Sequence, residues 1–81
     1  MKLPRPLCNM YYVYILKRKN DEFYIGYTED LERRLKQHRS KGTATLIYYE
    51  SYLLKKSATN REKKLKYYGS AWRSLRKRIT A

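Results

Sequence analysis

Residues 10–27 read MYYVYILKRKNDEFYIGY, two runs rich in β-branched and aromatic residues around a polar connection. The first run, residues 10–16, has no polar interruption, which predicts a strand covered on both faces. The connection, residues 17–22, contains Asn-Asp, which favours a turn, and residues 23–27 form a second short strand pattern. Together they predict a β-hairpin.

The segment after the hairpin has the pattern of a helix followed by a strand. Thr28 is the expected N-cap, two acidic residues follow it, and the helix should continue to about Ser40 before Gly42 ends it. A third strand is predicted for residues 45–52, where Tyr, Ile and Leu again combine.

Two further helices complete the chain. Ser57 is the expected N-cap of a helix that closes at Gly69, and Ser70 is the expected N-cap of the last one. The predicted order is ββαβαα. This is an α+β fold, a three-stranded antiparallel sheet flanked by helices.

Charge is the strongest signal in the composition. Twenty Lys and Arg against seven Asp and Glu give the 81-residue chain a net charge of +13. Such an excess indicates a polyanionic partner. Nucleic acid, most simply DNA, fits better than a membrane because no stretch approaches the roughly 20 apolar residues of a spanning helix. Charge does not distinguish binding from cleavage.

Length and cysteine usage limit the organisation. The chain has room for one small domain, expected over residues 10–81, after an extended lead-in over residues 1–9 that carries two prolines. Cys8 and His38 are the single residues of their kinds, which excludes an internal disulfide and the usual zinc site. With no signal-peptide pattern, a cytoplasmic location is expected.

The first helix places polar groups among its apolar residues. At 100° per residue Leu31, Leu35 and His38 share one stripe, and Arg34 lies on its edge. The same pattern would result if Arg34 extended its guanidinium to solvent and His38 were a hydrogen-bonded residue at the edge of the core.

The second helix repeats this feature at Glu62, which shares a stripe with Ala58 and Leu65. An unpaired carboxylate is costly to bury. A salt bridge to Arg34 or to a neighbouring Lys would explain it, and so would a metal ion. Glu50, on the third strand, is the second candidate ligand.

These residue types suit phosphodiester hydrolysis. One carboxylate can hold Mg²⁺ when water and a substrate phosphate complete the oxygen shell. Arg34 would clamp the phosphate, and a Tyr hydroxyl or His38 would activate the attacking water. Tyr14 and Tyr24 can emerge side by side on the hairpin. Packing in the core and sheet explains most of the remaining tyrosines, namely Tyr11, Tyr12, Tyr48, Tyr49, Tyr67 and Tyr68.

The spacing of these residues resembles a known family. Tyr-Val-Tyr at residues 12–14, Tyr-Ile-Gly at residues 24–26 and Arg34 on the following helix are similar to the signature of the GIY-YIG nucleases. The resemblance covers roughly residues 10–79. It is that of a small stand-alone member, similar to the catalytic domain of the excision-repair incision subunit.

The resemblance implies a role for each matching residue. Tyr14 matches the general base or water-orienting tyrosine, Arg34 the phosphate contact, and Glu62 the metal ligand. The candidate catalytic residues are Tyr14, Tyr24, Arg34 and His38. The candidate substrate contacts are Gly26, Arg33 and Lys41.

The implied activity is cleavage of DNA with a single Mg²⁺ or Mn²⁺ ion, selective for structure rather than sequence, in repair or recombination. A protein partner would supply further specificity. The chain departs from the family pattern in having Tyr12 at the first glycine and no late asparagine after Glu62. The alternative is a catalytically weak or inactive nucleic-acid-binding module, or an accessory subunit of a larger nuclease.

Overall fold

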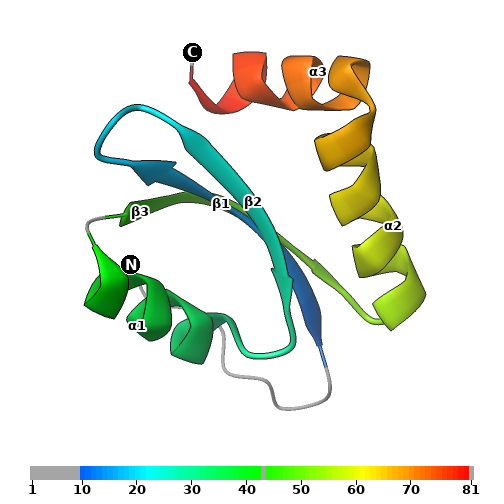
Figure 1. Cartoon of the computed structure of the whole chain (residues 1–81). Coiled ribbons are helices and arrows are strands. Elements are labelled where there is room, and N and C mark those ends of the chain that lie inside the picture. Colours follow the sequence, from blue (N-terminus) through cyan, green and yellow to red (C-terminus); the bar gives the residue numbers. More distant parts are fainter. Residues whose placement is uncertain (1–9, 43, 81) are drawn as a thin grey trace.

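The computed structural model describes residues 10–42 and 44–80. Its elements follow the order ββαβαα (Figure 1). They are β1 (Tyr11–Arg18), β2 (Phe23–Thr28), α1 (Leu31–Lys41), β3 (Ala44–Tyr52), α2 (Lys55–Tyr67) and α3 (Gly69–Ile79). None of these helices is long and apolar enough to cross a membrane. The predicted lead-in over residues 1–9 lies outside the described residues.

The three strands form one antiparallel sheet in the order β2-β1-β3. The predicted α+β fold is therefore confirmed. β1 is the central strand, and its residues from Tyr12 to Leu16 are buried. This explains the apolar run without polar interruption, because the side chains of a central strand are covered on both faces of the sheet.

Helices cover the two faces of the sheet separately. Tyr12, Tyr14 and Leu16 pack against Leu31 and Leu35 of α1. On the opposite face Val13 and Ile15 pack with residues of the C-terminal helices, namely Ala58, Leu65 and Leu75. Figure 1 shows α1 on one side of the sheet and the pair α2 and α3 on the other. Alternation along β1 thus divides its side chains between two small cores.

The hairpin connection is shorter than the sequence pattern predicted. β1 continues to Arg18, whose backbone N–H donates to the carbonyl of Glu22 at 2.8 Å. Asp21 adopts a positive φ of 64°, a conformation that Asp tolerates in turns. The predicted turn is confirmed, but Lys17 and Arg18 belong to β1 and not to the connection.

The start of α1 corrects the predicted N-cap. Asp30, not Thr28, caps the helix, and its side chain accepts a hydrogen bond from the backbone N–H of Arg33. Thr28 is buried, and its hydroxyl binds the backbone of Asp30 in the preceding turn. Gly42 ends the helix as predicted, with its N–H bonded to the carbonyl of Arg39.

The predicted caps of the last two helices are wrong. α2 begins at Lys55, before Ser57, without a side-chain cap. Gly69 opens α3 instead of closing α2, so Ser70 lies inside the helix. Tyr68 alone, in an extended conformation, separates the two helices. Because packing of Leu65 and Leu75 holds both helices on the sheet, neither needs the local capping signal that the sequence offered.

Candidate active site

The side chain of Tyr14 reaches across the neighbouring strand at Gly26. The two residues are direct partners in the antiparallel register of β1 and β2. A Cβ atom at position 26 would overlap with Cζ and Oη of the Tyr14 ring. Gly26 is itself buried, so its contribution is to let the Tyr14 ring lie over the β2 backbone.

Tyr14, Tyr24 and His38 form a cluster on the face covered by α1. The ring centroids of Tyr14 and Tyr24 are 6.1 Å apart, and those of Tyr24 and His38 are 5.0 Å apart. The Tyr14 hydroxyl oxygen lies 3.2 Å from Nε2 of His38. The hairpin and α1 therefore bring three of the four candidate catalytic side chains into contact.

The Tyr14 hydroxyl has an unusual electrostatic environment. Burial raises its pKa well above the ordinary value, and so do the neighbouring Tyr24 and Glu62, whereas Arg34 lowers it. Arg34 and Glu62 thus act on the same hydroxyl from α1 and from α2. The phenol stays protonated near neutral pH, so Tyr14 can take a proton from water only if its own proton passes to an acceptor.

A polar groove lies beside this cluster, with a volume of about 580 Å³. Cationic side chains from two helices line it, namely Arg33, Arg34 and Lys55, together with the carboxylates of Glu29 and Asp30. Arg34 is exposed, which corrects the expectation that it faces the core. The groove gives these cations access to solvent and to a phosphate group.

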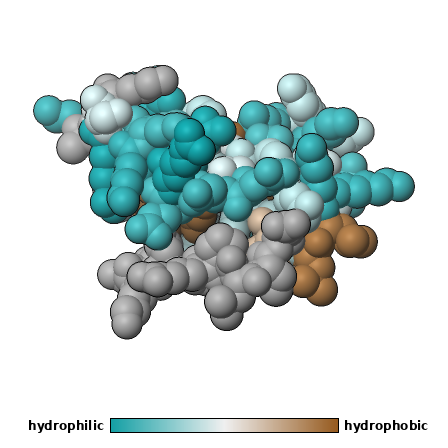
Figure 2. All heavy atoms as spheres, turned by 90° about the horizontal axis from the view of Figure 1, so that it is seen from below, coloured by the Kyte–Doolittle hydropathy of each residue, from teal (hydrophilic) through white to brown (hydrophobic). Residues whose placement is uncertain are grey.

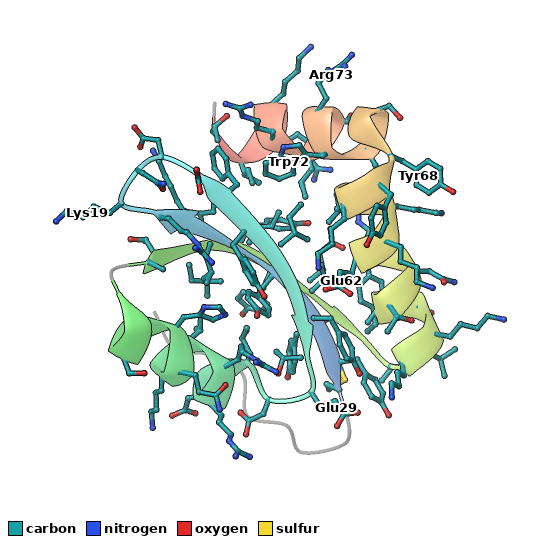
Figure 3. The ribbon with its side chains drawn as sticks, in the orientation of Figure 1. Lys19, Glu29, Glu62, Tyr68, Trp72 and Arg73 are labelled. Atoms are coloured by element: carbon teal, nitrogen blue, oxygen red, sulfur yellow. The ribbon has the colours of Figure 1, made fainter. Side chains whose placement is uncertain are left out.

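Glu62 lies on the side of α2 that faces the sheet (Figure 3). Its side chain is 21% exposed, and Oε2 is 3.2 Å from Nζ of Lys66. A neighbouring Lys, one of the partners that the sequence left open, thus pairs with it. Burial is the main cause of the raised pKa values of Tyr14 and Tyr27, and the charge of Glu62 adds a smaller contribution to both.

The donor chemistry at Glu62 suits a hard divalent cation. Within residues 10–42 and 44–80, no three His, Cys, Asp or Glu side chains gather as a metal-binding group. A carboxylate with hydrated neighbours matches Mg²⁺, which keeps several waters and takes few protein ligands. The Lys66 pair occupies one carboxylate oxygen and leaves the other for an ion.

Glu50, the second candidate ligand, is engaged elsewhere. Arg61 Nε and Nη2 donate to its two oxygens at 3.0 and 3.2 Å. The hydroxyls of Tyr48 and Tyr52 donate to the same carboxylate. With four donors on its oxygens, Glu50 ties β3 to α2 and has little capacity left for a metal ion.

Tyr27 and Lys55 are two of the groove residues that the sequence did not indicate. Tyr27 lies after the Tyr-Ile-Gly motif, and its hydroxyl donates to Glu29 at 3.4 Å. Lys55 was one basic residue among many, and no local pattern distinguishes it. Their common signal is position, because each adjoins a strand end beside the site. The predicted contact Lys41 is the last residue of α1, and its side chain lies outside the described part of the chain.

Comparison with known proteins identifies a family and several relatives of this chain. A family model described as the GIY-YIG catalytic domain matches residues 10–66. The chain is 40% identical over 62 residues to a UPF0213 protein of Clostridium perfringens, covering 65% of this chain and 67% of that protein. It is 31% identical over 67 residues to a UPF0213 protein of Haloquadratum walsbyi, covering 72% and 75%.

A solved structure shares both sequence and fold. The solution NMR structure of the UPF0213 protein BH0048 from Bacillus halodurans matches with a TM-score of 0.53 and 33% sequence identity. The match covers 70% of each chain. These findings confirm the resemblance that the two tyrosine motifs indicated.

Proposed function

Because this chain belongs to the GIY-YIG catalytic domain family, we propose that it is a divalent-metal-dependent endonuclease acting on DNA. One observation supports this most directly. Arg34 of α1 and Glu62 of α2 both act on the hydroxyl of Tyr14 in β1. A buried tyrosine with a perturbed pKa and charged residues acting on it is typical of catalytic sites.

The Tyr14–His38 contact suggests how water is activated. In the tautomer with a proton on Nδ1, Nε2 of His38 accepts the hydrogen bond of the Tyr14 hydroxyl. An attacking water gives its proton to the Tyr14 oxygen while the Tyr14 proton passes to Nε2. The water oxygen then bonds to phosphorus, and the bond to the leaving oxygen breaks. This relay lets a tyrosine with a raised pKa act as a base.

Arg34 and Glu62 have complementary parts in this proposal. The exposed guanidinium of Arg34 contacts the phosphate oxygens through its planar fork. Glu62 would hold the Mg²⁺ or Mn²⁺ ion, which, when bound, neutralises phosphate charge and stabilises the leaving oxygen. Tyr24 packs against both Tyr14 and His38 and keeps their rings in position.

Substrate choice follows from the groove. Arg33, Arg34 and Lys55 meet phosphates, which carry no sequence information. We therefore propose selectivity for branched or flapped DNA, in repair or recombination, with a protein partner supplying further specificity. The second candidate function, a nucleic-acid-binding module without turnover, is supported by the net charge of +13.

The test is cleavage of flapped, branched and single-stranded DNA with Mg²⁺ or Mn²⁺. Tyr14→Phe and Arg34→Ala should each lower the rate by about 10²- to 10³-fold, the usual cost of losing a proton-transfer or charge-stabilising group. Glu62→Gln should abolish the stimulation by metal.

Matched controls with the same residue types are available elsewhere in the chain. Tyr49→Phe, Arg39→Ala and Glu32→Gln change the same residue types at exposed or packing positions and should leave cleavage within about twofold. Wild-type cleavage that survives in both Arg34→Ala and Glu62→Gln would refute the proposed site. DNA binding without turnover on any of these substrates would support the second candidate function instead.

A further inference from the structure

We propose that the corner between α2 and α3 binds single-stranded DNA, which stacks on Tyr67 and Tyr68. This rests on the proposed action on DNA and adds a second contact surface, away from the groove. It would hold the unpaired arm of a branched or flapped substrate.

The two tyrosines of this corner are the most exposed aromatic residues described. Tyr67 is 77% exposed and Tyr68 is 63% exposed, which corrects the expectation that they pack in the core or sheet. In Figure 3 Tyr68 points away from the sheet, whereas Trp72 of α3 points toward it. Exposed aromatic rings in a basic surface are the platforms on which unpaired bases stack.

Cationic side chains flank the tyrosines on both helices. α2 and α3 together carry ten Lys and Arg and one acidic residue, Glu62. Lys56, Lys63, Lys64 and Tyr67 recur at helical spacing on the exposed face of α2. Arg73 continues the charge on α3 and points outward in Figure 3. Within the described ranges no carboxylate forms an ion pair with Lys63, Lys64 or Arg73.

This α2 track connects the groove to the tyrosines. Lys55, the first residue of α2, lines the groove, and Tyr67 is the last residue of the helix. From Lys55 to Tyr67 the helix rises roughly 18 Å along its axis, 12 steps of 1.5 Å. That is about five nucleotides at 3.4 Å per nucleotide. An unpaired arm therefore has to exceed about five nucleotides before its bases reach Tyr67 and Tyr68.

Single-stranded DNA explains this surface better than a protein partner does. On α2 and α3, Lys63, Lys64 and Arg73 form no ion pair with a described carboxylate, whereas the cores of protein interfaces are depleted in Lys. The other exposed apolar group, Leu53 and Leu54, lies where β3 passes into α2 (Figure 2). That pair is aliphatic and offers no ring for a base.

The experiment measures affinity as a function of arm length. Fluorescence anisotropy with chelator present, so that no metal-dependent cleavage occurs, is recorded for duplexes with arms of about two, five and eight nucleotides. We expect the wild-type affinity to rise about tenfold or more between the shortest and longest arms. In the double variant Tyr67→Ser with Tyr68→Ser the rise should be much smaller, because only phosphate contacts to the arm remain.

A matched double variant isolates stacking from hydroxyl chemistry. Tyr67→Phe with Tyr68→Phe keeps both rings and should keep the rise. The salt slope of the Ser variant should equal that of the wild type because stacking releases no counterions. Lys63→Gln with Lys64→Gln should instead reduce that slope by about 1.4. Thermal unfolding verifies that all variants are folded.

Several results would overturn the proposal. They are an equal rise with arm length in the Ser variant, a rise confined to RNA arms, and loss of self-association in the Ser variant without any effect of arm length. The outcomes also distinguish failure of this binding surface from failure of the proposed nuclease function. A rise with arm length in a chain that never cleaves DNA would leave this surface standing, whereas cleavage without a rise would remove the surface alone.

Discussion

Gly26 and Tyr14 show how one residue determines the position of another. The Tyr14 ring crosses β2 only because position 26 has no Cβ atom. From there its hydroxyl contacts His38, and the charges of Arg34 and Glu62 both act on its pKa. The glycine of the Tyr-Ile-Gly motif therefore acts on the chemistry through the position of Tyr14.

We expect Gly26→Ala to displace the Tyr14 ring. The added methyl group overlaps with Cζ and Oη, and the neighbouring atoms are part of a packed core. Overpacking of this kind costs about 1–3 kcal/mol of unfolding free energy. DNA cleavage should fall by at least about tenfold, since a misplaced catalytic group loses orientation.

Gly69→Ala is the matched control for that substitution. A Cβ atom at position 69 meets nothing within 4 Å, and the residue begins α3. Stability should stay equal or rise by up to about 1 kcal/mol, with cleavage unchanged. Equal urea midpoints for the Gly26→Ala and wild-type proteins would contradict the proposed close packing.

At the level of elements, α2 connects the site to the rest of the sheet. The helix presents Glu62 toward the hairpin tyrosines and Arg61 toward Glu50 of β3. Burial alone would raise the pKa of Glu50, but hydrogen bonds from Arg61, Tyr48 and Tyr52 outweigh it and lower the pKa below its ordinary value. Consecutive residues of one helix thus anchor the sheet and, in the proposed mechanism, hold the metal ion.

This anchor predicts how stability changes with pH. A carboxyl with a lowered folded-state pKa stabilises the fold above its unfolded pKa, near 4.3, and loses that contribution as the pH falls. Burial and the Glu50 hydrogen bond raise the pKa of Tyr52 to about 12, so its contribution is lost above about pH 10. Between these limits, from about pH 5 to 10, urea midpoints should vary little.

Glu50→Gln is the variant that tests this interpretation. It should lower the unfolding free energy at pH 7 by about 1–3 kcal/mol, because the partly buried Arg61 loses its charged partner. The variant should also lose less stability than the wild type between pH 5 and 3. Glu32→Gln, which removes an exposed pair with Lys36, should change stability by less than about 0.5 kcal/mol. An unchanged acid transition in Glu50→Gln would contradict the anchor.

At the scale of the whole molecule, charge and shape act together. The net charge of +13 attracts DNA to any face, whereas the groove gathers Arg33, Arg34 and Lys55 at one place. Long-range attraction and local phosphate contacts respond to salt through the same release of counterions. Substitutions that remove equal charge at different places therefore separate the two effects.

We expect the groove to dominate the salt dependence of duplex binding. Replacing Arg33, Arg34 and Lys55 with Gln should reduce the slope of log affinity against log salt by about 2.7. Replacing Lys17 and Lys36, which pair with nearby carboxylates, should reduce it by much less. Anisotropy titrations between low and moderate salt measure both slopes. Equal reductions per charge would show that duplex DNA binds without preference for the groove.

Much of the fold could be predicted because its signals are local. The hairpin, the α1 stripe and the inward placement of Glu62 all follow from periodicity and turn residues. The helix caps could not be predicted, since α2 and α3 begin without side-chain caps and are held by packing. Tyr67 and Tyr68 were misplaced because aromatic composition does not reveal exposure.

The tyrosine hairpin, the order of the elements and the residue types available for chemistry follow from the amino-acid sequence alone. Tertiary packing places the charge of Glu62 where it acts on Tyr14, binds Glu50 to Arg61, and joins Lys55 to Arg33 and Arg34 in one groove. The physical reason is range. Turn and strand patterns act over a few residues, whereas these pairings depend on how α1 and α2 pack against opposite faces of the sheet.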